Sequence, residues 1–128
     1  DIPRSMPSLL RAQRIGDKAS QAGFDWEDIQ GVVDKVKEEL SELEHELKNK
    51  NKDKSAKELG DLFFSLVNLS RHMGIDAETV SQSAVNKFIQ RFNLLEDKVS
   101  EQNKKFSDMS PKEMNEIWND IKKSKQDL

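Results

Sequence analysis

Five acidic residues form two short motifs in the first half of the chain. Glu38, Glu39 and Glu42 form an EExxE pattern, and Glu58 and Asp61 form an ExxD pattern. Residues three or four positions apart share a face of a helix, so each segment can present its carboxylates together. Two such helices packed antiparallel would surround a hard divalent cation, and Mg²⁺ takes oxygen ligands and commonly shares its site with substrate phosphates. The two motifs therefore indicate phosphate-transfer or hydrolysis chemistry on a helical scaffold.

A solvated helix face is the alternative interpretation of the EExxE motif, because glutamate favours helices and is usually exposed. The second motif argues against it. Glu58 and Asp61 stand directly before Phe63 and Phe64 in an apolar helix, and aspartate is a poor residue for a helix interior. Without a cation, clustered carboxylates would repel one another and raise each other's pKa. The pattern therefore favours a metal site.

Apolar residues recur at helical spacing throughout the chain, and no strand-like alternation competes with them. We expect a bundle of about five helices that forms one domain over residues 1–128. The start at Asp1 instead of methionine is typical of a piece of a longer chain. The expected helices run over residues 8–22, from Asp25 or Asp28 to about Lys48, from Asp53 or Ser55 to Gly74, from Asp76 through Val99, and from Ser110 onward.

The composition narrows the class of protein. Only 34% of the residues are hydrophobic while 35% are charged, which suits helices that are apolar on one side and buried between subunits. A net charge of −3 argues against a nucleic acid polymer as partner. The absence of cysteine excludes disulfides and thiolate zinc sites. No segment has the length of a membrane span or the pattern of a signal peptide, so we expect a cytoplasmic protein without a membrane partner.

Besides the acidic motifs, four blocks of sequence resemble a known protein family, and the resemblance extends over almost the whole chain. With fifteen residues between EExxE and ExxD, the sequence resembles the MazG-type all-α nucleoside triphosphate pyrophosphohydrolases. It is most similar to the second, C-terminal domain of two-domain members. The blocks that carry the resemblance are PSLLRAQRIGDKASQAGFDW (7–26), ELGDLFFSLVNLSRHMGIDAETV (58–80), AVNKFIQRF (84–92) and EIWNDIK (116–122).

The resemblance implies Mg²⁺-dependent hydrolysis of an NTP or dNTP to the monophosphate and pyrophosphate, with Mn²⁺ as an alternative metal. Water would attack the α-phosphate. Glu38 and Glu39 would be catalytic, with Glu38 positioning the water or lying just outside the metal ligands. The metal ligands implied by the motif match are Glu39, Glu42, Glu58 and Asp61. The residues expected to bind the substrate are Lys35, Asn86, Lys87, Arg91, Trp118 and Lys122.

Other interpretations stay open at this stage. Lys87 and Arg91 form an i,i+4 pair that suits phosphate contacts, but the same spacing describes a solvated basic stripe. Trp118 suits either base stacking or the core. At the level of function, the alternatives are a related pyrophosphohydrolase with a narrow choice of substrate (dUTP, dCTP or phosphoribosyl-ATP) and a non-catalytic helical dimerisation module. We expect a homodimer or a higher homo-oligomer in each case.

Overall fold

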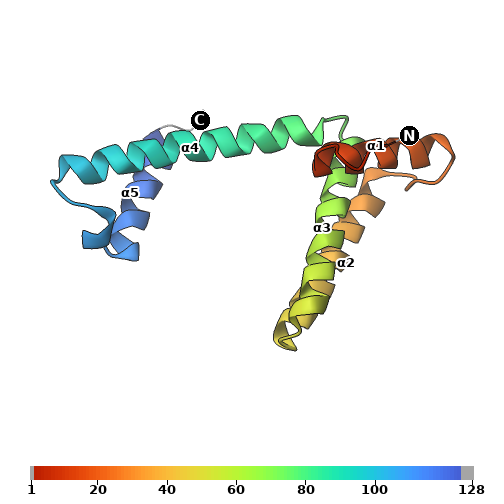
Figure 1. The fold of residues 1–128 in the computed structure, drawn as a ribbon, viewed down its shortest axis with the longest axis horizontal. Coiled ribbons are helices and arrows are strands. Elements are labelled where there is room, and N and C mark those ends of the chain that lie inside the picture. Colours follow the sequence, from red (N-terminus) through yellow and green to blue (C-terminus); the bar gives the residue numbers. More distant parts are fainter. Residues whose placement is uncertain (1, 125–128) are drawn as a thin grey trace. The chain divides into compact units, whose positions relative to one another are not determined.

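The computed structural model describes residues 2–124, and this part of the chain contains five α-helices and no strand (Figure 1). The prediction of an all-α fold is therefore confirmed. No helix in the described part combines the length and the apolar character that crossing a membrane requires. The helices are α1 (Ser8–Gln21), α2 (Ile29–Lys48), α3 (Lys52–His72), α4 (Ala77–Glu101) and α5 (Pro111–Ser124), with the 3₁₀ turn η1 (Phe106–Asp108) before the last of them.

The chain folds as two compact units, Asp1–Val80 and Ser81–Leu128. The first unit holds α1, α2, α3 and the first turn of α4. The second holds the rest of α4 together with η1 and α5. That the two units together form the single domain expected over residues 1–128 stays a prediction.

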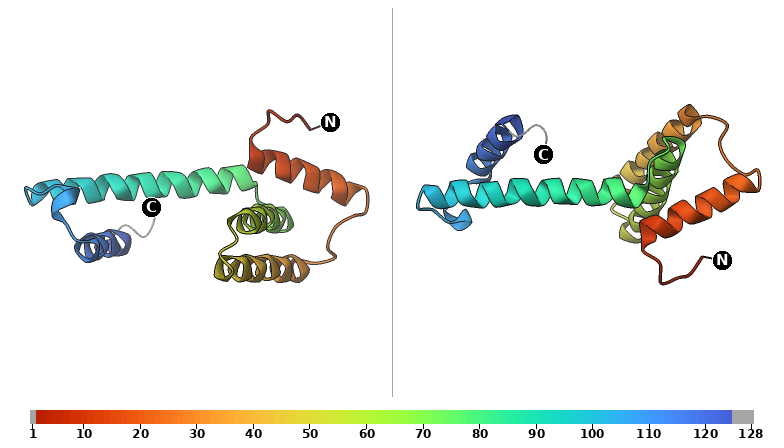
Figure 2. Two further views of the ribbon diagram at one scale, coloured as in Figure 1. Left: turned by 60° about the horizontal axis from the view of Figure 1, so that its bottom comes forward. Right: turned by 90° about the horizontal axis from the view of Figure 1, so that it is seen from above.

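Helices α2 and α3 form an antiparallel hairpin, and α1 packs against α3 (Figure 2). Val32 on α2 and Val67 on α3 are almost completely buried, and they mark the apolar side of the hairpin. The turn between the helices is short, and Lys50 takes a positive φ of 54° within it. This hairpin sets the EExxE segment beside the ExxD segment.

Polar side chains cap the beginnings of α2 and α3. Asp28 accepts a hydrogen bond from the Gly31 backbone N–H, as expected, at 2.9 Å. The expectation that Asp53 or Ser55 caps the third helix is wrong, because Asn51 accepts from the Lys54 N–H at 3.1 Å and the helix begins at Lys52. The sequence offers several polar residues here. Asn51 is the one with extended backbone (φ −97°, ψ 95°) directly before the helix, as a cap requires.

The second unit has a small core of its own. The last helix begins at Ser110 and Pro111, as predicted. Ser110 Oγ accepts from the Glu113 N–H, and the Glu113 carboxylate accepts from the Ser110 N–H. The Trp118 ring packs on the Phe88 ring at a centroid distance of 5.2 Å, although Phe88 remains 57% exposed. The buried apolar residues of this core are Leu95, Val99, Met109 and Ile121.

A partly buried ion pair links the loop after α1 to the end of α3. Arg71 Nη1 and Nη2 donate to the two carboxylate oxygens of Asp25 at 3.2 and 3.0 Å, and His72 Nε2 lies 3.0 Å from Asp25 Oδ1. Arg71 Nε donates to Asn68 Oδ1 at 3.1 Å. A Cβ at Gly16 would collide with Arg71 Nε, so glycine leaves room for the guanidinium to pass. The hydrogen bonds from Arg71 hold the pKa of Asp25 well below its usual range.

We predict that Asp25→Asn lowers the free energy of unfolding by about 3 kcal/mol at pH 7, because it removes the nearer carboxylate partner of the Arg71 side chain and leaves only Asp17, at 3.9 Å. The pKa of Asp25 is depressed in the folded state, so its contribution is present above the unfolded-state pKa and declines as the pH falls below about 4. The difference between the variant and the wild type should therefore shrink between pH 7 and pH 3. Urea denaturation followed by circular dichroism measures this. Asp34→Asn, at an exposed position of α2, is the control, and equal effects of the two substitutions would contradict the prediction.

Candidate metal centre

Three of the predicted carboxylates meet between α2 and α3. Glu39 on α2 and Glu58 and Asp61 on α3 each offer an oxygen, and these oxygens lie within 4.8 Å of one another. Glu39 is buried, Glu58 is partly buried and Asp61 is exposed. The group therefore runs from the interior of the hairpin to its surface, so that a cation held inside would still be reached by a ligand from solvent.

Helical spacing explains how the sequence places these groups. Glu58 and Asp61 are three positions apart on α3 and share one face. Glu39 lies on the side of α2 that carries the buried Val32, seven residues or two turns earlier, so its side chain enters the hairpin. The turn at residues 49–51 reverses the chain between them. The arrangement of the two motifs on neighbouring antiparallel helices is as predicted.

The charges in the cluster act on one another. Hydrogen bonding to Glu42 raises the pKa of Glu58 to about 7, and burial and the neighbouring charges of Glu42, Glu39 and Asp61 add to the increase. Protonated Glu58 can donate to the Glu42 carboxylate. In the metal-free protein, a proton thus offsets part of the repulsion that the helix packing imposes.

Two carboxylate oxygens of the cluster lack a hydrogen-bond donor and are therefore candidates for binding a cation. Glu39 Oε2 and Glu58 Oε2 are buried and have no hydrogen-bond partner in the structure. A buried carboxylate oxygen without a partner is costly, and carboxylate oxygens are the ligands that hard cations such as Mg²⁺ prefer. The donor set consists of oxygen alone. These residues therefore fit a hard divalent metal ion.

The other acidic-motif residues and Lys35 surround this group on α2. Glu42 is exposed and reaches the cluster through Glu58. Lys35 Nζ lies 3.1 Å from Glu38 Oε2 and 3.1 Å from Glu39 Oε1. Hydrogen bonding to Glu39 and Glu38 raises the pKa of Lys35. The structure thus places Glu38 beside the lysine, at an exposed position next to the buried carboxylate.

The remaining predicted residues belong to the second unit. Asn86 and Lys87 are exposed on α4, and Arg91 is partly buried one turn later. On α5, Lys122 is exposed, whereas Trp118 is partly buried against Phe88, which gives the ring a packing role in this unit. The part of these residues in binding substrate stays a prediction.

The sequence profile of the MazG nucleotide pyrophosphohydrolase domain matches residues 19–94, which include both acidic motifs. The chain belongs to the MazG family. Its sequence is 41% identical over 130 residues to a nucleoside triphosphate pyrophosphohydrolase of Escherichia coli K12. It is 38% identical over 122 residues to the nucleoside triphosphate pyrophosphohydrolase/pyrophosphatase MazG of Thermotoga maritima.

These matches cover 100% and 95% of this chain but only 49% and 47% of the two relatives. The chain thus spans about half the length of the curated MazG relatives that it matches. The profile match also includes the block from Asn86 to Arg91, whereas Trp118 and Lys122 lie beyond its last residue.

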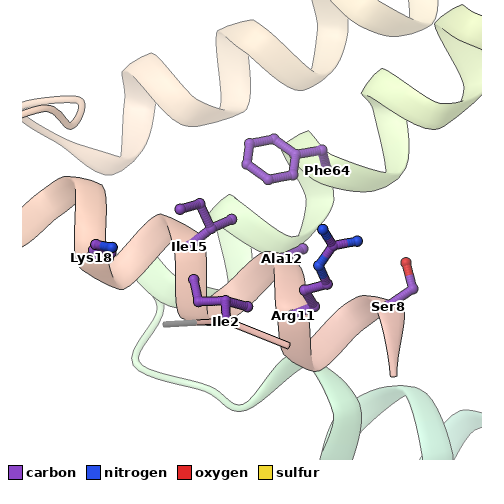
Figure 3. A pocket seen from close by; sticks show the side chains of 7 residues that line it. All are labelled: Ile2, Ser8, Arg11, Ala12, Ile15, Lys18 and Phe64. Atoms are coloured by element: carbon purple, nitrogen blue, oxygen red, sulfur yellow. The ribbon is translucent and has the colours of Figure 1, made fainter. Parts of the chain in front are cut away.

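A cavity of about 490 Å³ in the first unit of this MazG chain was not predicted from the sequence. Figure 3 shows Phe64 projecting from α3 toward α1, on which Ile15 and the basic residues Arg11 and Lys18 also line the cavity. Its size lies in the range of ligand-binding pockets. Phe64 follows Asp61 by three residues, so the cavity begins about one turn of α3 from the carboxylates. The sequence feature that could have indicated this cavity is the pair Arg11 and Lys18, which are seven positions apart and share a face of α1.

We predict that Glu58→Gln raises the thermal unfolding temperature of the metal-free protein at pH 8, because glutamine removes a repelling charge and can still donate to Glu42. The raised pKa of Glu58 means that the folded wild type holds a proton which the unfolded chain releases above about pH 4.5. Wild-type stability from this group should therefore fall as the pH rises from 4.5 through 7. The advantage of the variant should accordingly be small at pH 5 and full at pH 8.

Calorimetric melting in EDTA at the two pH values tests this. Glu44→Gln is the control, because it removes the same charge from an exposed position of α2 in the same hairpin. A variant that melts below the wild type at pH 8 would show that the Glu58 carboxylate is a structural support instead of a source of repulsion.

Proposed function

We propose that the protein hydrolyses nucleoside triphosphates, NTP or dNTP, to the nucleoside monophosphate and pyrophosphate, with Mg²⁺ as its metal and Mn²⁺ as an alternative. The observation that carries the proposal is the buried Glu39 carboxylate, whose unpartnered oxygen faces no hydrogen-bond donor while Glu58 and Asp61 lie close by. Membership of the MazG family supports the reaction type. The names of the two relatives point to the same substrates.

In this proposal, some acidic residues of the hairpin bind the metal and another positions the attacking water. Glu39, Glu58 and Asp61 hold the metal, and Glu42 completes the set from the exposed side. When bound, the metal neutralises phosphate oxygens and so makes the α-phosphorus open to attack by water. Glu38, exposed beside the cluster, accepts a hydrogen bond from the attacking water and positions it. The attack forms a bond from the water oxygen to the α-phosphorus and breaks the bond to the pyrophosphate oxygen.

Basic residues supply the contacts to the rest of the substrate. Lys35 is already beside the acidic cluster. Lys87 and Arg91 are one helical turn apart on α4 and are suited to phosphate oxygens, and arginine can form paired hydrogen bonds with them. Further contacts proposed from the motif match come from Asn86, Trp118 and Lys122. The cytoplasmic location expected from the sequence stays a prediction.

The reaction should release pyrophosphate and place the oxygen of water in the monophosphate. Incubation with a panel of NTPs and dNTPs in ¹⁸O-water, with Mg²⁺ or EDTA, followed by mass spectrometry of the products, tests both statements. Orthophosphate and nucleoside diphosphate would indicate cleavage at the γ-phosphate and contradict the proposal. Turnover of a single nucleotide would favour a narrow-substrate relative, and no turnover of any nucleotide would favour the non-catalytic dimerisation module.

The assignment of the site to this reaction is checked with matched variants in the same assay. Glu39→Gln removes the buried charge while keeping the size of the side chain, and should abolish turnover without changing the helical circular dichroism. Glu44→Gln is the control. Wild-type turnover in Glu39→Gln would remove this residue from the site.

We also propose that a second copy of the chain covers the exposed apolar faces of α2 and α3. The α3 face is defined by Leu59, Phe63, Leu66 and Met73, which are 42–54% exposed, and Leu40 and Leu47 on α2 are also open to solvent. Leaving such regular stripes in water is unfavourable, and a stripe that repeats at helical spacing can pack on its own copy around a twofold axis. The low hydrophobic content of the chain agrees with a core that is shared between copies.

Leu66→Asp should therefore convert an oligomer into a monomer, because it sets a charge on this face at a position that is 43% exposed within one copy. Sedimentation velocity measures the change. Lys57→Asp, on the opposite side of α3 by helical spacing, is the control and should leave the assembly intact. A wild type that sediments as a monomer would contradict the proposal directly.

A further inference from the structure

The buried carboxylate of Glu39 is shared between two kinds of positive charge. Its side chain is 7% exposed, and its Oε1 lies 3.1 Å from Lys35 Nζ. Its Oε2 is buried without a hydrogen-bond partner, and the residue belongs to the group of three carboxylates that fits a metal ion. One carboxylate therefore serves both an ammonium group of this chain and the cation of the proposed site.

We propose that Lys35 is a built-in counter-ion of the acidic cluster, and that its contact with Glu39 opposes the binding of the divalent cation. This inference rests on the proposed metal site. In the metal-free protein the ammonium group neutralises part of the charge that the helix packing gathers. If a divalent ion occupied the cluster, the same ammonium group would be near a like charge, and the two would compete for Glu39.

Glu38 is a second ion-pair partner for Lys35. Its Oε2 is also 3.1 Å from Lys35 Nζ, but the Glu38 side chain is 55% exposed and lies outside the group of three. The Lys35 side chain is 37% exposed, and lysine has a flexible stem with rotatable donors. Lys35 can thus leave Glu39 while keeping Glu38. Arginine would hold the carboxylate through a planar pair of donors and would give it up less readily.

Linkage makes the competition reciprocal. If Lys35 weakens metal binding, then the metal weakens the contact between Lys35 and Glu39 by the same factor. Filling the cluster therefore releases an ammonium group at the edge of the site. A triphosphate brings the negative charge that a released ammonium would contact. Metal and substrate binding are coupled in this way through one side chain.

Calorimetric titration of the protein with MgCl₂ and with MnCl₂, without nucleotide, tests the inference. Lys35→Met should bind both ions about ten-fold more tightly than the wild type, within the usual range of couplings between sites. Lys37→Met removes the same charge from the same helix away from Glu39, and its affinity should match the wild type. Metal-free Lys35→Met should melt below the wild type, because Glu39 loses its counter-ion, and saturating metal should close the gap.

The outcomes separate this inference from the proposed function. Absence of binding to either ion in both the wild type and Lys35→Met would overturn the metal site and the role of Lys35 together. A wild type that binds metal while Lys35→Met binds it equally or more weakly would overturn the role of Lys35 alone and leave the metal site standing. Lys35→Gln keeps a hydrogen-bond donor for Glu39 without the charge. It gives the same comparison if the methionine variant does not fold.

Discussion

Repulsion among carboxylates in the α2–α3 hairpin is the constraint around which the first unit is organised. Helix packing places Glu39, Glu58 and Asp61 within reach of one another, and the interior position of Glu39 keeps water from screening all of the charge. The cluster can be relieved by a proton on Glu58, by the ammonium group of Lys35 or by a metal ion. The proton on Glu58 and the ammonium group beside Glu39 act on different carboxylates and can be present together, whereas a metal ion held by both carboxylates would displace each of them. Proton release and lysine displacement therefore accompany metal binding at the proposed site.

Such a cluster needs a frame that resists opening. The hairpin is closed at one end by the short turn that Asn51 caps, and α3 is tied near its other end by the ion pair between Arg71 and Asp25. The guanidinium of Arg71 reaches that partner across 46 residues of sequence and passes over Gly16 on α1. The frame thus joins all three helices of the unit. Its outer faces remain apolar and exposed, which is why a second copy is part of the proposed assembly.

Local patterns predicted the parts of the structure that depend on local physics. Helical periodicity predicted the five helices, and Asp28 could be named as one of two candidates for a cap because a cap residue lies next to the helix that it begins. The two acidic motifs could be paired because a short polar connector forces antiparallel packing. The ion pair between Asp25 and Arg71 could not be found this way, since nothing in the neighbourhood of either residue specifies its partner. The cavity near Phe64 could not be predicted either, because it is lined by residues that are distant in the sequence, from α1, α3 and the segment before α1.

Repulsion in the acidic cluster lowers the stability of the metal-free protein and thereby raises the affinity of the proposed site for metal. Any interaction that destabilises the metal-free state more than the metal-bound state strengthens metal binding by the same free energy. Carboxylate repulsion works in this direction, whereas the contact of Lys35 with Glu39 works against it because it stabilises the metal-free state. A cluster without the lysine would hold a cation tightly even when no substrate is present. With it, part of the binding free energy appears only when phosphate oxygens arrive to contact the displaced ammonium. The proposed site would therefore bind the metal most tightly when the triphosphate is bound as well, which is the state in which the proposed hydrolysis would take place.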